Sequence, residues 1–314
     1  MAAIQNRTPV TYFGATVRGG YVQQPATPLI GLPNVLRSFA SGSGIVAVID
    51  TGVDPNHPAL KGVLVSGYDF TRDQPGPASE MADLNQSTVA ILDQSTVAIL
   101  DAKKLPSDFG HGTMVAGLIH LVAPTARIMP LKAFKSDGSA NLSDIVRAIY
   151  YAVDNHAKVI NMSFSSLADS PSVVAAMQYA WSHDVICVAS GGNQGRNLAV
   201  YPAADKGVIG VGATNDQDER SPFSNYDTPS VRMAAPGEAL ITTYPGNNYA
   251  GVWGTSFSTA LTSGAVALLA QINPRVRPDD IADALEHGHM LKIDGMGDAR
   301  LDVMATLLYY VFNR

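Results

Sequence analysis

The chain has 314 residues, of which 46% are hydrophobic and 15% are charged, so it holds enough apolar material for one large core. Its net charge of -6 excludes a strongly basic surface, and we predict neither nucleic acid nor a membrane as a partner. No uninterrupted apolar run reaches the length of a membrane span. The one cysteine, Cys187, lies in the apolar run DVICVAS, so no disulfide can form within the chain and we expect a buried thiol.

The N-terminus lacks the basic-then-apolar order of a signal peptide. We therefore expect a secreted or cell-envelope protein in its mature form, without its leader; a cytoplasmic protein is the alternative. Residues 1–40, which include YVQQPATPLIGLPNVL, are predicted to form an N-terminal arm that packs near the sheet.

Beyond the arm, short apolar runs typical of buried strands alternate with stretches of helical periodicity. Strands are predicted at 44–50, 127–134, 158–164, 185–190 and 207–213. Helices are predicted at 111–122, 142–155, 171–183 and 301–312, and two more are predicted to begin at 256 and at Pro278. Ser143 is the predicted N-cap of the helix at 142–155. This alternation predicts an α/β fold, with a mostly parallel central sheet and helices on both faces. Because no Gly/Ser linker divides it, we treat 41–314 as one domain.

Three polar signals stand where strands end or helices begin, the places where sites gather in such sheets. Asp50 ends the apolar run in AVIDTGVDPNHPAL. His111 opens a helix in DFGHGTMVAGLI, between two glycines that let the backbone turn tightly. Ser256 begins a helix in WGTSFSTALTSGAVALL, so its backbone N–H is free to bind a ligand.

These residue types suit nucleophilic catalysis. A serine hydroxyl becomes a good nucleophile when an imidazole takes its proton, and a buried carboxylate orients that imidazole. Asp50, His111 and Ser256 follow one of the known chain orders for such a triad. Asn193, in ASGGNQG after a predicted strand, is suited to place an amide beside the serine as an oxyanion hole.

The stretches quoted above resemble the subtilisin-like serine protease family, the subtilases of peptidase class S8, from about residue 43 to 273. The resemblance implies a three-layer subtilisin-like fold and an endopeptidase acting on polypeptides through an acyl-enzyme. It implies that Asp50 orients the base, His111 is the general base and acid, Ser256 is the nucleophile and Asn193 is the oxyanion donor. Because no triad member is missing, a non-catalytic binding protein is disfavoured.

The resemblance also implies that an extended peptide pairs with two exposed strand edges. The residues it assigns to these edges and their pockets are Ser136, Gly138, Ala140, Ser163, Phe164, Ser165, Phe134, Leu142, Gly191 and Val200. Ser165 stands where the family usually has Gly, which changes the pocket wall. Val200 stands where the family often has Gly at the floor of the primary pocket, so we predict a preference for small or medium side chains.

Two departures from the family pattern carry further expectations. The stretch GLIHLVAPTARI lacks the loop through which many members bind calcium, so we predict no required cofactor or metal and leave open a weak calcium site. Ala260 replaces the usual Pro four residues after Ser256, which relaxes the helical turn and shifts the serine relative to His111. A peptide ligase or cyclase using the same serine is therefore the alternative to a hydrolase.

The octapeptide QSTVAILD occurs twice without change at 86–101, within a predicted insertion at about 80–105. Because the period of eight is even, both copies present the same residues to the same face of a strand. We predict a β-hairpin or two short stacked strands, in preference to a helix, that form an accessory flap beside the cleft or a contact between chains. The repeat has no predicted chemical role, and a neutral duplication is the alternative.

Overall fold

The core of the protein is a twisted central sheet. The structure, a computed structural model, describes residues 2–84, 105–290 and 293–313. Within them the strands of this sheet are β3 (Ile45–Asp50), β4 (Gly67–Asp69), β5 (Gln74–Gly76), β6 (Arg127–Lys132), β7 (Ala157–Met162), β8 (Ile186–Ser190), β9 (Val208–Thr214), β10 (Met233–Pro236), β13 (His289–Met290) and β14 (Ala299–Arg300). Their order is β13-β14-β10-β9-β8-β7-β3-β6-β4-β5. The pairs from β14 to β4 are parallel, and the edge strands β13 and β5 pair antiparallel, which confirms the mostly parallel sheet.

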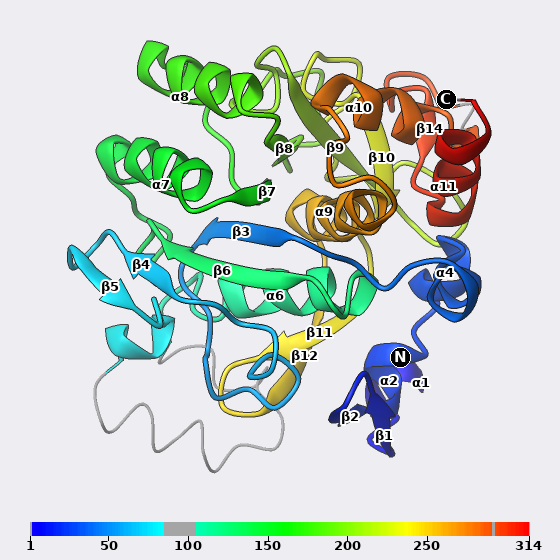
Figure 1. The fold of residues 1–314 in the computed structure, drawn as a ribbon, viewed down its shortest axis with the longest axis horizontal. Coiled ribbons are helices and arrows are strands. Elements are labelled where there is room, and N and C mark those ends of the chain that lie inside the picture. Colours follow the sequence, from blue (N-terminus) through cyan, green and yellow to red (C-terminus); the bar gives the residue numbers. More distant parts are fainter. Residues whose placement is uncertain (1, 85–104, 291–292, 314) are drawn as a thin grey trace.

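Helices cover both faces of this sheet (Figure 1). On one face lie α7 (Leu142–Asp154) and α8 (Pro171–Ser182), and on the other α6 (His111–Val122) and α9 (Thr255–Ile272). Two further helices, α10 (Pro278–Glu286) and α11 (Val303–Phe312), pack against each other near β14. The predicted α/β architecture in three layers is confirmed, and the predicted strands and helices begin and end within two residues of the observed ones.

The alternation of side chains along β3 links the sequence to the two layers of core. Val46 and Val48 pack in the core shared with α6 and α9. Ala47 and Ile49 point to the opposite face and pack in the core shared with α7 and α8. Because both faces are covered, the strand is an almost continuous apolar run that ends at Asp50.

The start of α7 differs from the prediction. The structure begins this helix at Leu142, and Asn141 is the last residue with extended backbone. The side-chain amide of Asn141 donates to Asp144 Oδ2 at 2.9 Å. The expectation that Ser143 is the N-cap is therefore wrong, because Ser143 already lies inside the first turn.

The helix α9 is long and apolar enough, by composition, to cross a membrane. However, 89% of its 18-residue window is buried inside the protein, as in the core helix of a globular domain. Its burial follows from its place under the sheet, where it contacts β7, β8 and β9.

The N-terminal residues, which include the antiparallel pair β1 (Pro9–Tyr12) and β2 (Ala15–Arg18), pack on α6 and on the hairpin of β11 (Leu240–Tyr244) and β12 (Asn248–Val252). They also form α1 (Ala2–Gln5), α2 (Gly19–Val22), α3 (Ala26–Leu29) and α4 (Leu32–Ser38). The hydroxyl of Tyr21 donates to the backbone oxygen of Gly117 at 2.6 Å, and Gln24 exchanges two hydrogen bonds with the backbone of Ile241. The division of the chain at residue 40 stays a prediction.

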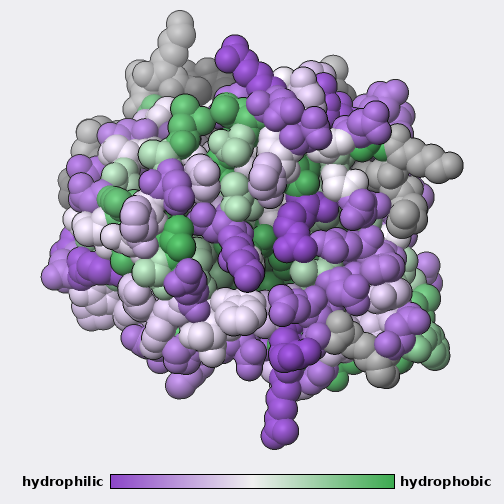
Figure 2. All heavy atoms as spheres, turned by 90° about the horizontal axis from the view of Figure 1, so that it is seen from above, coloured by the Kyte–Doolittle hydropathy of each residue, from purple (hydrophilic) through white to green (hydrophobic). Residues whose placement is uncertain are grey.

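The face seen from above is hydrophilic over most of its area, with hydrophobic residues in small separate groups (Figure 2). Such a surface is typical of a protein whose large apolar residues are used in the core. The predicted hairpin at 86–101 lies outside the described residues.

Two buried histidines are His120, within α6, and His57, which packs against Tyr249 of β12. His57 Nδ1 accepts from Ala59 N at 3.2 Å and its Nε2 lies 3.0 Å from the backbone oxygen of Asn248, so the neutral ring is satisfied. Among the described residues neither ring nitrogen of His120 has a partner, and the ring packs edge-on against Tyr12. Burial lowers the pKa of each imidazole from 6.5 to about 4.

We expect the protein to lose stability as the pH falls from about 6.5 to about 4. Over this range the histidines take up protons in the unfolded chain but stay neutral in the folded one. Each can remove about 3 kcal/mol of the free energy of unfolding. Urea unfolding between pH 4 and 8 measures the effect, and His120→Leu, which cannot titrate, should weaken the pH dependence. An identical pH dependence in this variant would contradict the assignment.

Candidate active site

The site begins where β3 ends. Asp50 is the last residue of the strand and its carboxylate is buried. Its Oδ1 accepts from the backbone N–H of Thr51 at 2.7 Å. His111 Nδ1 lies 2.8 Å from Oδ1 and 3.0 Å from Oδ2. The carboxylate therefore fixes the orientation of the imidazole, with the proton on Nδ1 and Nε2 free to act as a base.

Two glycines allow the helix that carries His111 to start so close to the strand. Gly110, the N-cap of α6, has φ of 91°, in the left-handed region that favours glycine. A Cβ on Gly112 would lie 2.1 Å from the backbone oxygen of Gly52, so a side chain there would push the helix away from the strand end. The approach of α6 to β3 thus depends on residues that flank His111 in sequence.

Opposing effects set the proton affinity of His111. Desolvation of the ring lowers its pKa, but the negative charge of Asp50 and the hydrogen bond to it act in the other direction. The net result is a pKa raised above 6.5. The ring also packs against Phe257, with centroids 5.6 Å apart.

Ser256 lies in the first turn of α9, which begins after Gly254. Its Oγ donates to the backbone oxygen of Ser163 at 2.9 Å, and Ser163 Oγ donates back to the backbone oxygen of Ser256 at 2.8 Å. This reciprocal pair holds the start of α9 against the end of β7. The hydroxyl hydrogen bond of Ser256 goes to Ser163, so the hydroxyl must rotate before it can donate to His111.

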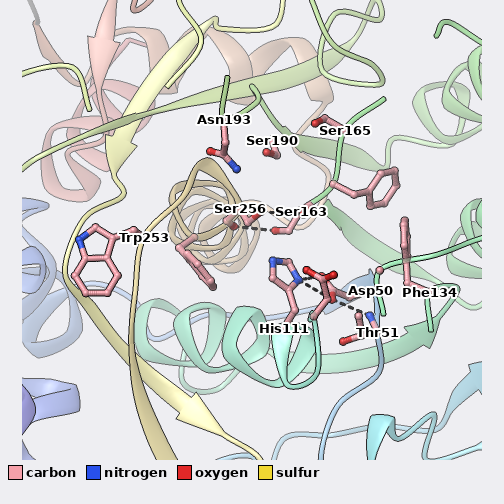
Figure 3. A pocket seen from close by; sticks show the side chains of 14 residues that line it. Asp50, Thr51, His111, Phe134, Ser163, Ser165, Ser190, Asn193, Trp253 and Ser256 are labelled. Atoms are coloured by element: carbon pink, nitrogen blue, oxygen red, sulfur yellow. Dashed lines mark hydrogen bonds and ion pairs between the residues drawn. The ribbon is translucent and has the colours of Figure 1, made fainter. Parts of the chain in front are cut away.

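Asn193 follows β8, and its amide is oriented by the residue before Ser256. Asn193 Oδ1 accepts from both the backbone N–H and the hydroxyl of Thr255, each at 2.9 Å. With the oxygen held in this way, the Nδ2 group is left to face the space beside Ser256 (Figure 3). The first-turn N–H groups of α9 have no carbonyl four residues earlier, so the Ser256 N–H is available next to it.

These groups border one cavity of about 370 Å³ (Figure 3). Its wall consists of Asp50, Thr51, Asp108, His111, Phe134, Gly138, Ser163, Phe164, Ser165, Ser190, Asn193, Trp253, Ser256 and Phe257. The aromatic rings of Phe134 and Phe164 lie 4.9 Å apart and form an apolar wall on one side of Ser256, opposite Trp253. All four predicted catalytic residues are thus brought together around one space.

Half of the predicted substrate-binding residues border this cavity, namely Phe134, Gly138, Ser163, Phe164 and Ser165. The other five do not. Ser136 is buried and donates its hydroxyl to Asp83, and Ala140 and Leu142 are exposed outside the cavity. Val200 is 1% exposed within the core, and Gly191 packs closely against the backbone oxygen of Val211.

Trp253 is the clearest cavity residue that the sequence analysis missed. Its side chain is 59% exposed although it is large and apolar, and it lies beside Ser256 (Figure 3). A signal was present, because Trp253 directly precedes the Gly-Thr-Ser motif at a helix start. An exposed tryptophan at such a position is suited to contact a bound chain.

The described residues include no group of three or more His, Cys, Asp or Glu side chains that could hold a metal ion. Cys187 is buried in β8, and burial raises the pKa of its thiol to about 12, so it is not a nucleophile at neutral pH. The hydroxyl of Ser256, in contrast, borders the cavity beside His111.

Comparison with known proteins places this geometry in context. The profile of the subtilase family matches residues 42–301. The chain is 37% identical to a thermophilic serine proteinase of Bacillus sp. (strain AK1), over 72% of this chain and 51% of the relative, so it spans about half that protein's length. It is 31% identical to an intracellular serine protease of Paenibacillus polymyxa, over 80% of this chain and 74% of the relative. A crystal structure of a cold adapted subtilisin-like serine proteinase superposes with a TM-score of 0.70 at 26% identity, covering 84% of this chain and 90% of that one.

We predict that the reactivity of Ser256 toward a fluorophosphonate falls as the pH drops through the raised pKa of His111. A protonated imidazole cannot accept the serine proton, so the rate should fall about tenfold per pH unit below that value, which lies above 6.5. Asp50→Asn should lower the rate by about 10³-fold or more. It should also move the midpoint to lower pH, because burial of the ring remains while the negative charge is gone.

The rate of labelling between pH 5 and 9 measures both effects. Asp137→Asn, an exposed carboxylate that does not border the cavity, is the matched control. An unchanged midpoint in Asp50→Asn would show that this carboxylate does not set the proton affinity of His111.

Proposed function

The chain belongs to the subtilase family of serine proteases, and on this premise we propose that it cleaves peptide bonds through an acyl-enzyme formed on Ser256. The observation that carries the proposal is the convergence of three element ends on one cavity. The end of β3, the start of α6 and the start of α9 bring a carboxylate, an imidazole and a hydroxyl to its wall.

In the first step the hydroxyl of Ser256 turns from the Ser163 oxygen toward His111 Nε2. The serine oxygen then attacks the substrate carbonyl while Nε2 takes its proton. The imidazolium that forms keeps its Nδ1 hydrogen bond to the Asp50 carboxylate, whose negative charge stabilises it.

The negative oxygen of the tetrahedral intermediate needs hydrogen-bond donors. We assign this role to Asn193 Nδ2 and the backbone N–H of Ser256. The two bonds from Thr255 to Asn193 Oδ1 orient the amide before substrate arrives, so no reorganisation is needed during the reaction.

The intermediate collapses when His111 returns its proton to the leaving amine, and the first product departs. Water then enters and attacks the acyl carbonyl while His111 takes one of its protons. His111 returns this proton to Ser256 Oγ as the bond to the acyl group breaks, which releases the acid product and restores the free serine. Each step is a transfer between groups of this chain, the substrate and water.

The substrate is a polypeptide, and we propose that it lies along the cavity past Gly138 and the segment from Ser163 to Ser165. The ring pair of Phe134 and Phe164 would accept an apolar side chain before the cleaved bond. Trp253, on the opposite side of Ser256, would contact residues after it.

Hydrolysis is favoured over the ligase alternative. The relatives are named as proteinases or proteases, and none of the named relatives is a ligase. Location outside the cytoplasm and an assembly role for 86–101 stay predictions.

We expect Asn193→Ala to lower kcat by about 10²–10³-fold with little change in KM, a range known for the same type of amide in subtilisin. The reason is that the amide would bind the oxyanion more strongly than the ground-state carbonyl. Steady-state hydrolysis of a fluorogenic peptide measures the change, with Ser256→Ala as the inactive reference. Asn197→Ala, an exposed asparagine on the same loop, is the matched control. A loss confined to KM would contradict the oxyanion role.

Val200 does not border the cavity, so its place at the floor of the primary pocket stays a prediction; if it holds, cleavage after Ala should exceed cleavage after Phe. Val200→Gly should raise the Phe-to-Ala ratio of kcat/KM by about tenfold or more. A matched pair of peptides differing only at that residue tests this. Equal rates for the two peptides with the unaltered protein would refute the shallow pocket.

A further inference from the structure

A buried carboxyl group lies behind the wall of the cavity. Glu80, the first residue of the short 3-10 helix η1 (Glu80–Asp83), is 0% exposed. Its Oε2 accepts from the hydroxyl of Thr51 at 2.8 Å and from the backbone N–H of Gly110 at 3.1 Å. One oxygen atom therefore joins the residue directly after Asp50 to the residue directly before His111.

The helix that carries His111 needs such a group. Its N-cap is Gly110, which has no side chain to bind the unpaired first-turn N–H groups. The hydroxyl of Thr51 accepts from the N–H of Gly112 at 3.0 Å and donates its own hydrogen to Glu80. Glu80 and Thr51 together act as an N-cap supplied from outside the helix.

The other oxygen of Glu80 extends the network. Glu80 Oε1 accepts a short hydrogen bond from the hydroxyl of Thr113, in the first turn of α6. The Thr113 hydroxyl in turn accepts from the backbone N–H of Asp54 at 2.8 Å. The carboxyl thus contacts the strand end, the helix start and the first turn of the helix at once.

The segment that carries Glu80 is itself fixed to the sheet. Lys132, at the end of β6, is fully buried, and its Nζ donates to Asp83 Oδ2 at 2.7 Å and to the backbone oxygen of Thr51 at 2.8 Å. Asp83 Oδ2 also accepts from the backbone N–H of Ser136 at 2.9 Å. The 3-10 helix that carries Glu80 is therefore attached to the end of β6 through Asp83 and Lys132.

We propose that Glu80 is a positioning residue for the His111–Asp50 pair, acting through Gly110 and Thr51 without touching substrate. The kinetic part of its test depends on the proposed function. The proposal also changes the predicted insertion at about 80–105, because its first residues, Glu80 and Asp83, belong to the support of the site.

The environment of Glu80 indicates which protonation state of its carboxyl positions the His111–Asp50 pair. Burial raises its pKa to about 8, against hydrogen bonds from Thr113 and Thr51 that lower it, and the charge of Asp50 raises it further. The raised pKa favours the neutral carboxyl, whose oxygens accept from Thr51, Gly110 and Thr113. A glutamine has the same shape, with one acceptor oxygen and one donor amide.

The kinetic test compares Glu80→Ala, Glu80→Asp and Glu80→Gln with the unaltered protein, using a fluorogenic peptide at a temperature where all remain folded. We expect Glu80→Ala to lower kcat about 100-fold with KM changed less than about threefold, because His111 loses its fixed position. Glu80→Asp, too short to reach both Thr51 and Gly110, should lose at least tenfold. Glu80→Gln should recover most of the loss. The matched control is Ile281→Ala, which opens a cavity in the core at α10.

Several results would overturn the proposal. The proposal fails if the kcat of Glu80→Ala stays within threefold of that of the unaltered protein. It also fails if Ile281→Ala loses as much kcat as Glu80→Ala, because the loss would then reflect lower stability in general. If Glu80→Ala does not fold, the other two variants decide. Full activity in Glu80→Asp would overturn the proposal, and so would a loss of activity in Glu80→Gln as large as that in Glu80→Asp.

A second measurement does not use peptide hydrolysis and so separates this proposal from the proposed function. Proton NMR detects the His111 Nδ1 hydrogen bonded to Asp50 at low field. We expect this resonance to stay sharp in Glu80→Gln and to shift or broaden in Glu80→Ala or Glu80→Asp. An unchanged resonance in all variants would overturn the positioning role even if hydrolysis proceeds through Ser256.

Discussion

The hydrogen bond between His111 and Asp50 depends on the close approach of a helix start to a strand end. The approach is feasible because Gly112 leaves room for the backbone of Gly52, and because Gly110 can adopt a left-handed conformation. After β7, the strand that pairs with β3, Ser163 exchanges hydrogen bonds with Ser256 that hold the start of α9. The chemistry of the cavity therefore follows from element ends that meet, each held by contacts between backbone and short polar side chains.

A buried polar layer supports this meeting point. Glu80 bonds to Gly110, next to His111 in the chain, and Lys132 bonds to Thr51, next to Asp50. Asp83 joins this layer through its ion pair with Lys132. Buried charged groups are costly unless paired, and here each has partners. We propose that this layer fixes the end of β3 relative to the start of α6, and so fixes Asp50 relative to His111. The predicted repeat at 86–101 follows directly after this layer in sequence.

The residues Asp50, His111, Ser256 and Asn193 could be identified from sequence because each stands at the boundary of a strongly periodic element. Glu80 could not, because its role arises only when a short irregular segment folds back beneath α6. For the same reason half of the predicted substrate residues lie away from the cavity, since loop geometry decides which edge residues face it. Ser143 and Asn141 both have side chains suited to an N-cap, so the sequence alone does not distinguish them, and the backbone angles assign the position to Asn141.

We propose that Ser256 is the reacting group, that His111 and Asp50 take up its proton, and that Asn193 stabilises the developing negative charge. A crystal structure of the protein after reaction with a fluorophosphonate tests this most directly. We predict a covalent bond to Ser256 Oγ, now turned away from the Ser163 oxygen, with a phosphonyl oxygen within hydrogen-bond distance of Asn193 Nδ2 and the Ser256 N–H. A bond to another residue, or a phosphonyl oxygen that points away from Asn193, would contradict the account.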